Sequence, residues 1–418
     1  MKNINFKITQ APKLWLGLYI LIYCFPFPFN EIPYSYYYIT RHIDIAKKKL
    51  SIWVGEFFFG LEDIEFIEIN GSGDTLVDYL GVVAVGLIAL VLTLITISLI
   101  KKKETIYRFY AGIIIYARYF VGLTLISYGV IKFLEGQFPS PSLLALETTY
   151  GESSPMGLAW RFFGYSYIYK GFMGASEVLA GFLLLFRRTA ILGSLISIAV
   201  CTNIFLVNLS FDVPVKLFSG HLLLFSILIA APSIKYLIKF FLLHQRTLIR
   251  PSVYRFDKKW KRVSYYSVKI FLVGLIPLGL IVGHVNSQSF YIYINEWEGV
   301  YQVDSFEIEG KPDLAFTAKW NKVLIQGKTI ITINNAKTRS YYTIENIWNE
   351  GEINFVEDNE QEDPFTLRIT PIDGEKTYRL ETKIGDNVYQ LETTRKIKED
   401  YLLIKRGFNW VNERPFNR

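Results

Sequence analysis

Long apolar runs, separated by short polar or basic segments, fill about the first two thirds of the chain. They lie at residues 14–29, 79–100, 109–134, 171–186, 189–209, 215–237 and 265–285. Several exceed about 17 residues, which is enough to cross a bilayer as an α-helix and too long for an ordinary core strand. The pattern therefore predicts a polytopic α-helical membrane bundle of about seven transmembrane helices.

From residue 290 onward the apolar runs end and the pattern changes to a period of two. Phe365, Leu367 and Ile369 alternate with polar neighbours, as a half-buried strand requires. Residues 322–333 and 401–405 are each predicted as one strand. The spacing predicts an antiparallel β barrel or sandwich of about eight strands, and we expect the tail, residues 406–418, to pack against it.

The two patterns divide the chain into four predicted segments. Residues 1–106 are expected to form a two-helix membrane segment with an extracytoplasmic loop, and residues 107–242 a four-helix membrane core. Residues 243–289 then hold a basic cytoplasmic loop and the last transmembrane helix. Residues 290–418 form an extracytoplasmic β domain.

Basic tracts predict how the chain is oriented in the membrane. Residues 101–103, residues 187–188 and the segment 246–262 fall on one side if every run crosses once. Positively charged tracts favour the cytoplasmic side, so the N-terminus is expected inside and the β domain in the periplasm. Residues 47–49 are a local exception within a longer loop. The prediction is a multi-pass protein of the inner membrane.

Charge and cysteine content narrow the possible functions. The net charge is +7 and the pI is about 9.0, but the basic residues flank apolar runs and form no stripe interleaved with aromatics, which argues against nucleic acid as a partner. The cysteines Cys24 and Cys201 lie far apart in predicted membrane spans. No zinc site or dithiol relay can be inferred from them, and no metal site is predicted.

Polar residues inside the predicted helices share faces with glycines. Arg118, Gly122, Gly129 and Lys132 follow one another at helical spacing on the third run, as do Gly174, Glu177 and Gly181 on the fourth. Glycines allow a neighbouring helix to approach closely, so both faces are expected to contact protein rather than lipid. We predict that Lys132 and Glu177 form a buried, interacting pair.

Helical rise places several polar residues in the outer half of the bundle. They form the candidate binding cluster Lys132, Glu177, Asn208, Asp212 and His221. Each has a structural alternative: Lys132 can extend to the headgroups, Asn208 and Asp212 can end a helix, and His221 can be a hydrogen-bonded core histidine. Glu177 is costly to insert into a membrane and would carry a proton if it were desolvated.

Three further residues are secondary candidates. Arg118 lies alone in the inner half of the bundle, and Arg161 lies on a short helix that begins at Ser153, Ser154 and Pro155. Asp74 follows a Gly-Ser-Gly turn and is expected to cap the next helix. The chain has no HExxH, GxSxG or GxGxxG motif, which excludes common hydrolase, metalloprotease and dinucleotide-binding classes and leaves open whether it is an enzyme.

The third to sixth runs resemble the DoxX-like family of integral membrane proteins. The resemblance lies in residues 127–132 (Ser-Tyr-Gly-Val-Ile-Lys), 174–181 (Gly-Ala-Ser-Glu-Val-Leu-Ala-Gly) with Arg187 and Arg188, and 212–218 (Asp-Val-Pro-Val-Lys-Leu-Phe). The whole chain is similar to a longer bacterial form of the family, which carries a C-terminal β domain and a tail like residues 406–418. The resemblance implies a four-helix membrane core, and some relatives are subunits of quinone-linked or redox-associated complexes.

Three functions remain open on this basis. The first is an accessory or binding subunit that presents the outer β domain to another protein. The second is a quinone- or lipid-binding redox subunit that uses the outer polar cluster, with quinone as the cofactor. The third is a proton-coupled transporter that uses Glu177. The lipid bilayer is a partner in all three, and quinone or another membrane protein is the further partner that the first two require.

Overall fold

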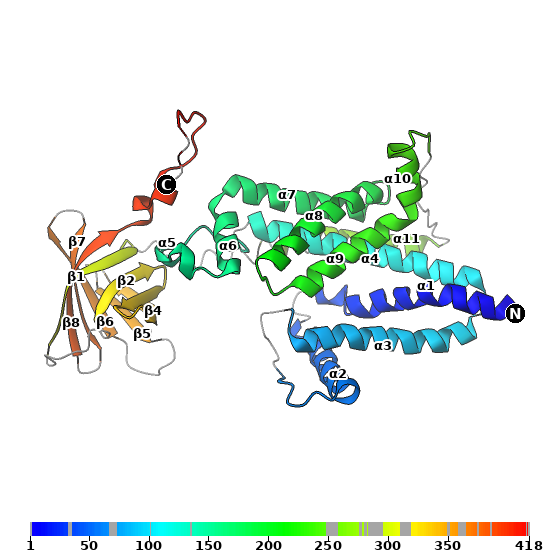
Figure 1. Ribbon diagram of the computed structural model, residues 1–418, viewed down its shortest axis with the longest axis horizontal. Coiled ribbons are helices and arrows are strands. Elements are labelled where there is room, and N and C mark those ends of the chain that lie inside the picture. Colours follow the sequence, from blue (N-terminus) through cyan, green and yellow to red (C-terminus); the bar gives the residue numbers. More distant parts are fainter. Residues whose placement is uncertain are drawn as a thin grey trace. The chain divides into compact units, whose positions relative to one another are not determined.

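The structure is a computed structural model that describes residues 2–31, 36–66, 73–100, 102–133, 136–247, 258–275, 278–279, 282, 296–309, 319–348, 352–357, 365–373, 376–384, 387–414 and 416. The chain divides into two compact units, shown in Figure 1. The first unit comprises Met1–Phe138 and Ser154–His284, and the second comprises Pro139–Ser153 and Val285–Arg418.

The first unit is a bundle of α-helices (Figure 1). Its helices are α1 (Lys2–Cys24), α2 (Arg41–Phe59), α3 (Leu76–Leu99), α4 (Lys103–Phe133), α6 (Pro155–Tyr165), α7 (Tyr167–Leu185), α8 (Ala190–Ser210), α9 (Lys216–Ala230), α10 (Ile234–Phe241) and α11 (Lys259–Ile270). Short turns of other helix types lie at η1 (Phe29–Glu31), η2 (Tyr36–Thr40), η4 (Ala231–Ser233) and η5 (Phe271–Leu275).

Five helical segments among the described residues are long and apolar enough to cross a membrane: α3, α4, α7, α8 and Lys216–Phe241. They confirm that the second to sixth apolar runs form helices long and apolar enough to span a membrane. The first run forms α1, whose N-terminal half carries Lys7, Gln10, Pro12 and Lys13 and which is not among the five. The seventh run is described only in part, because most residues after Leu275 lie outside the described residues.

The helix α2 forms in a stretch whose polarity gave no helical prediction. It packs on α3 through small residues, since a Cβ on Gly55 would come within 2.7 Å of the Leu80 side chain. Trp53, Phe57 and Phe58 are exposed, and the rings of Trp53 and Phe57 stack at 5.2 Å. Aromatic side chains of this kind are typical of the membrane interface.

The second unit is built around a closed antiparallel barrel in which every strand pairs with its neighbour in sequence and β1 pairs with β8. The strands are β1 (Gly299–Glu309), β2 (Trp320–Gln326), β3 (Thr329–Asn334), β4 (Arg339–Trp348), β5 (Glu352–Glu357), β6 (Phe365–Asp373), β7 (Thr377–Ile384) and β8 (Asn387–Lys396). Its interior is filled with apolar side chains, among them Tyr301, Ile325, Ile353, Leu367 and Leu391. The predicted barrel or sandwich is therefore a closed barrel of 8 strands.

Two of the strand predictions were wrong in detail. The predicted strand 322–333 is a hairpin, because Gly327 adopts φ +55° and turns the chain between β2 and β3. Residues 401–405 do not form a strand. A 3₁₀ turn, η7 (Lys398–Asp400), ends the barrel, and Leu402–Lys405 form the short helix α13.

The connector between α4 and α6 belongs to the second unit. It contains α5 (Leu143–Glu147) and η3 (Tyr150–Glu152). Leu143 is buried against Val300, Leu324, Ile331 and Tyr401, and its backbone N–H donates to Gln326 Oε1 at 2.9 Å. Sequence analysis placed this connector within the four-helix core, but its contacts are with the barrel.

Candidate functional site

The helices α4 and α7 are in backbone contact through two pairs of glycines. A Cβ on Gly129 would lie 2.5 Å from the carbonyl oxygen of Gly174, and one on Gly181 would overlap the carbonyl oxygen of Gly122. Only glycine permits helix axes to approach this closely. The glycine faces predicted from the sequence therefore meet each other, and the polar residues between them are enclosed by protein.

The Lys132–Glu177 pair lies between these two helices. The Lys132 Nζ is 2.7 Å from Glu177 Oε2, and the two side chains are 5% and 3% exposed. The ammonium group also lies 5.8 Å from the ring centroid of Tyr128 and 5.6 Å from that of Phe138. The predicted buried pair is confirmed, and the alternative in which Lys132 extends to the headgroups is excluded for this structure.

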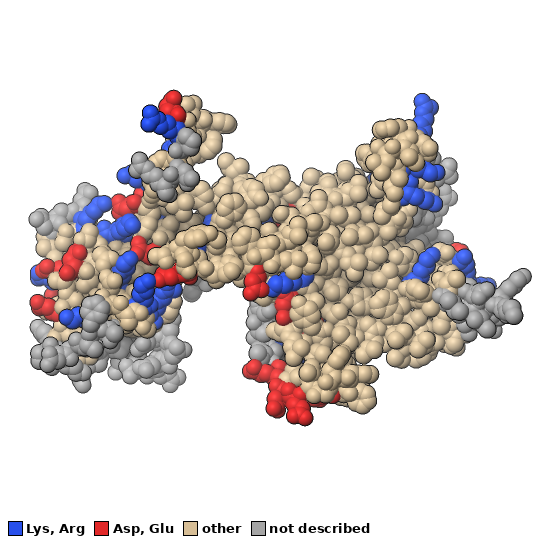
Figure 2. Space-filling view, viewed as in Figure 1, with Lys and Arg blue, Asp and Glu red and all other residues tan. Residues whose placement is uncertain are grey.

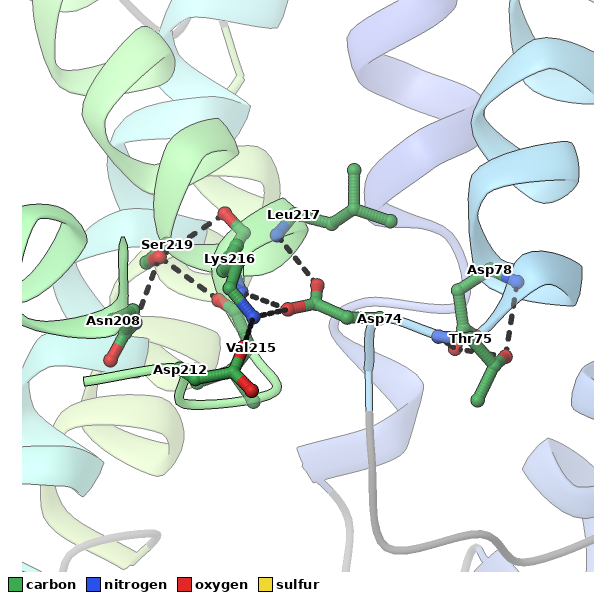
Figure 3. A network of polar contacts seen from close by, with 9 residues as sticks. All are labelled: Asp74, Thr75, Asp78, Asn208, Asp212, Val215, Lys216, Leu217 and Ser219. Carbon is green, nitrogen blue, oxygen red and sulfur yellow. Dashed lines mark hydrogen bonds and ion pairs between the residues drawn. The ribbon is translucent and has the colours of Figure 1, made fainter. Parts of the chain in front are cut away.

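Asn208 and Asp212 have local partners where α8 turns into α9 (Figure 3). Asn208 Nδ2 donates to Ser219 Oγ at 3.0 Å. Asp212 accepts from Lys216 Nζ at 2.8 Å with its own side chain 83% exposed, and this hydrogen bond holds the pKa of Asp212 below its ordinary value. Both residues stabilise the turn, which is the structural alternative considered for them.

Asp74 caps a helix other than the one that the sequence suggested. Its carboxylate accepts the backbone N–H groups of Lys216 at 2.6 Å and Leu217 at 2.8 Å, at the start of α9 (Figure 3). The N-cap of α3 is Thr75, which forms a capping box with Asp78. Asp74 thus joins the turn before α3 to the turn before α9, and the prediction that it caps the following helix was wrong.

His221 belongs to an aromatic group that sequence analysis did not find. Its Nδ1 lies 2.7 Å from the Leu217 carbonyl oxygen, which can only accept, so Nδ1 carries a proton. In the neutral ring Nε2 then accepts from the Tyr19 hydroxyl at 2.6 Å. Tyr23 stacks on the imidazole with centroids 3.9 Å apart and planes 11° apart. We call Tyr19, Tyr23 and His221 the Tyr–His stack.

Two cavities adjoin the Tyr–His stack. The first, of about 430 Å³, lies among α1, α2, α3 and the start of α9 and is lined by Tyr23. The second, of about 290 Å³, is lined by His221. Leu217 lines both cavities. Tyr23, which lines the first cavity, stacks on His221, which lines the second.

The first cavity is lined by both polar and apolar side chains. The Tyr19 hydroxyl is bonded to His221, but the Tyr23 hydroxyl makes no hydrogen bond within the described part of the chain. The rest of the first cavity is apolar on the side of Val82, Val85 and Ile88 and charged on the side of α2. A cavity of this size with an apolar wall and polar groups on one side is typical of small-molecule sites.

Hydrogen bonds thus separate the predicted cluster into three groups. Lys132 and Glu177 form one, Asn208 and Asp212 belong to the α8–α9 turn, and His221 belongs to the Tyr–His stack. Tyr19 and Tyr23 are one helical turn apart, and that spacing was the available signal for them. Lys170 was also missed: it is 1% exposed and donates to the Phe138 carbonyl at 3.0 Å.

The remaining secondary candidates make mainly local contacts. Arg161 donates from Nε to the Gly157 carbonyl one turn earlier, at 3.1 Å, on the helix α6. The N-cap of this helix is Ser154, and Pro155 is its first residue, as predicted. Arg118 is 8% exposed, and its guanidinium lies 5.4 Å from the ring centroid of Tyr119. Neither residue lines either of the two cavities described above.

Comparison with known proteins gives a relative without an assigned function. The chain is similar to the uncharacterised protein YwoB of Bacillus subtilis, with 39% identity over 99 residues, which is 24% of this chain and 62% of the relative. The chain thus spans less than two thirds of that relative. No protein-family model matches the chain. No solved structure matches it either.

Proposed function

We propose that this chain is a DoxX-like inner-membrane protein that acts as a binding subunit for a quinone-class molecule and presents its β barrel in the periplasm. The family resemblance and the basic tracts support the placement of the chain. The observation that carries the ligand is the first cavity, which Tyr23 lines beside an apolar wall. A quinone head is a flat apolar ring with two carbonyl acceptors, which matches an apolar wall with donors near it; besides Tyr23, Lys47 and Lys48 of α2 line the same cavity.

The Tyr–His stack holds Tyr23 in place for such a ligand. The imidazole of His221 is fixed at both nitrogens, by the Leu217 carbonyl and by the Tyr19 hydroxyl. Tyr23 stacks on this fixed ring, so its orientation toward the cavity is set before a ligand arrives. A quinone would accept from the Tyr23 hydroxyl, and its chain would lie along the apolar residues of α3.

The proton-coupled transporter receives less support from the same geometry. Transport through Glu177 requires a path for water or substrate to its carboxylate. Glu177 is 2% exposed, is paired with Lys132 and lies between two glycine contacts that bring α4 and α7 together. These contacts fit a static ion pair within the bundle better than a carrier site.

The test is the amount of quinone that remains bound to the purified full chain. We expect quinone to be extracted from wild-type protein in mild detergent and identified by mass spectrometry. Tyr23→Leu removes the donor and the stacking ring, and Tyr19→Phe removes only the hydroxyl that fixes His221. Both should lower the bound quinone, the first more than the second.

Tyr119→Phe is the matched control. It removes a comparable hydroxyl contact between helices, to Tyr265 at 2.7 Å, and Tyr119 lines neither cavity. Its quinone content should equal that of the wild type. The proposal fails if wild-type protein carries no more quinone than an unrelated membrane protein purified in parallel, or if all three variants lose it equally.

A further inference from the structure

In the described part of the C-terminal tail, the large apolar side chains are exposed and do not pack against the barrel, contrary to expectation. Phe408 is 72% exposed, Trp410 is 90% exposed and Val411 is 76% exposed. The rings of Phe408 and Trp410 contact each other edge to face at 5.0 Å. Leu402 and Leu403 of α13 are exposed as well. Ile404 packs against the cluster around Leu143 and Tyr401, but several other large apolar side chains of the same segment are exposed.

The charged residues of the same segment are mainly basic. Lys405, Arg406 and Arg414 accompany Glu413 among the described residues of the tail. Arg406 also lies over the ring of Phe416 at 4.9 Å. Trp and Phe side by side with Arg and Lys are suited to the boundary between headgroups and acyl chains, where the rings are buried and the cations meet lipid phosphates.

The start of the tail contacts a connector that lies in the sequence between α4, a candidate membrane span, and the short helix α6. Tyr401 is 7% exposed, packs on Leu143, and donates its hydroxyl to Glu147 at 2.5 Å. Leu143 and Glu147 belong to the connector Pro139–Ser153, which continues directly from α4 and into α6. The tail is thus linked through the connector to α4, a candidate membrane span, whereas a second protein would have to be recruited.

We propose that residues 402–414 form an arm that binds the surface of an anionic bilayer and buries Phe408 and Trp410 at the headgroup level. The contribution of the rings follows from the apolar area that they would remove from water. The cations would add electrostatic attraction to the anionic headgroups. This inference concerns the second unit and does not rest on the quinone proposal.

The test measures the depth of position 410 in the full chain. Trp410→Cys is labelled with a fluorophore, and the protein is placed in nanodiscs of phosphatidylcholine and phosphatidylglycerol that contain nitroxide-labelled lipid. The native cysteines are 4% and 1% exposed and should not react. We expect nitroxide lipid to quench the label severalfold more strongly than it quenches a label at Lys383→Cys.

Lys383 is the matched control because its side chain is exposed and it lies near one end of β7. The other end of β7, at Thr377, pairs with Thr394 close to the start of the tail. Omission of phosphatidylglycerol, or the double change Arg406→Glu and Arg414→Glu, should reduce the quenching at position 410. Equal weak quenching at both positions would overturn the proposal and favour a protein partner. Quenching that ignores phosphatidylglycerol would overturn the anionic bilayer as the ligand.

Discussion

The two units of this protein use their interiors in opposite ways. The barrel fills its interior with apolar side chains such as Ile325, Ile353 and Leu391, and Figure 2 shows charged side chains of both signs on its surface. The bundle shows long uncharged stretches of surface in the same view. It keeps an ion pair, the Tyr–His stack and cavities of about 430 Å³ and 290 Å³ inside.

This difference is the reason that the proposed small-molecule site is placed in the bundle. An intramembrane polar group is costly to bury and is retained where it has a partner or a role. Because the barrel interior is filled with apolar side chains, a partner would have to bind its outer surface. We therefore assign ligand binding to the bundle and surface contacts to the barrel and its tail. The following predictions test that division, from the largest expected effect to the smallest.

The largest effect is expected at the buried ion pair. Lys132→Met leaves the Glu177 carboxylate without its partner, and the free energy of unfolding should fall by about 3–5 kcal/mol. Combining it with Glu177→Gln should restore part of that loss, because no isolated charge remains. The measurement is a double-mutant cycle on unfolding of the full chain in detergent.

The exposed pair Arg108–Glu104 provides the control cycle. Its two side chains are 80% and 68% exposed, respectively, so the coupling should be about 0–1 kcal/mol. If Lys132 and Glu177 show effects that simply add, they do not interact in the folded protein. The enclosed polar interior of the bundle would then lose its main support.

The next effect concerns the close approach of α4 and α7. Gly181→Ala places a methyl group onto the Gly122 carbonyl oxygen and within 2.9 Å of Ile126 Cγ1. We expect a loss of about 1–3 kcal/mol in the free energy of unfolding, because the helices must move apart. The same measurement on Gly112→Ala, which would meet nothing within 4 Å, should show no loss. Equal effects of the two changes would contradict the close contact.

The smallest of these effects is expected at the ionic contact that holds the connector to the barrel. Glu147 accepts from Lys322 and Tyr401 and lies 3.9 Å from Lys396. Burial opposes ionisation of Glu147, but hydrogen bonds from Lys322 and Tyr401 outweigh it and hold its pKa below the ordinary value. Glu147→Gln should therefore destabilise the barrel by about 1–2 kcal/mol at neutral pH.

A lowered folded-state pKa also fixes the pH dependence of this contribution. It is present in full above the unfolded-state pKa of about 4.3, and it is lost as the pH falls through the lower folded-state value. At neutral pH the amides of β2 should be better protected from exchange in the wild type than in Glu147→Gln. This difference should disappear in that acid range. Hydrogen exchange of both proteins at each pH measures it. A difference that persists unchanged at low pH would show that ionisation of Glu147 plays no part.

Sequence reasoning succeeded where the signal was local. The period of two marked the barrel strands, and helical spacing placed Lys132 and Glu177 on glycine-bearing faces of consecutive helices. It failed where two distant segments decide the outcome. Asp74 caps α9 rather than the following helix because the loops before α3 and α9 meet, as the 2.9 Å hydrogen bond from Gly73 to the Pro214 carbonyl shows.

The Tyr–His stack could not be derived for the same reason. Tyr19 and His221 are 202 positions apart in sequence, and nothing in the spacing of either helix indicates that α1 lies beside α9. The exposed tail was also misjudged. It was expected to pack on the barrel, but Phe408 and Trp410 are exposed.

The central claim is that the bundle, beside Tyr23, takes the ligand. A photoreactive quinone analogue, bound to the full chain in nanodiscs and cross-linked by light, tests it most directly when labelled peptides are identified by mass spectrometry. We predict labelling of α1, α3 and the start of α9, with competition by unlabelled quinone and loss in Tyr23→Leu. Labelling confined to the barrel, or labelling of the bundle that quinone does not displace, would contradict the account.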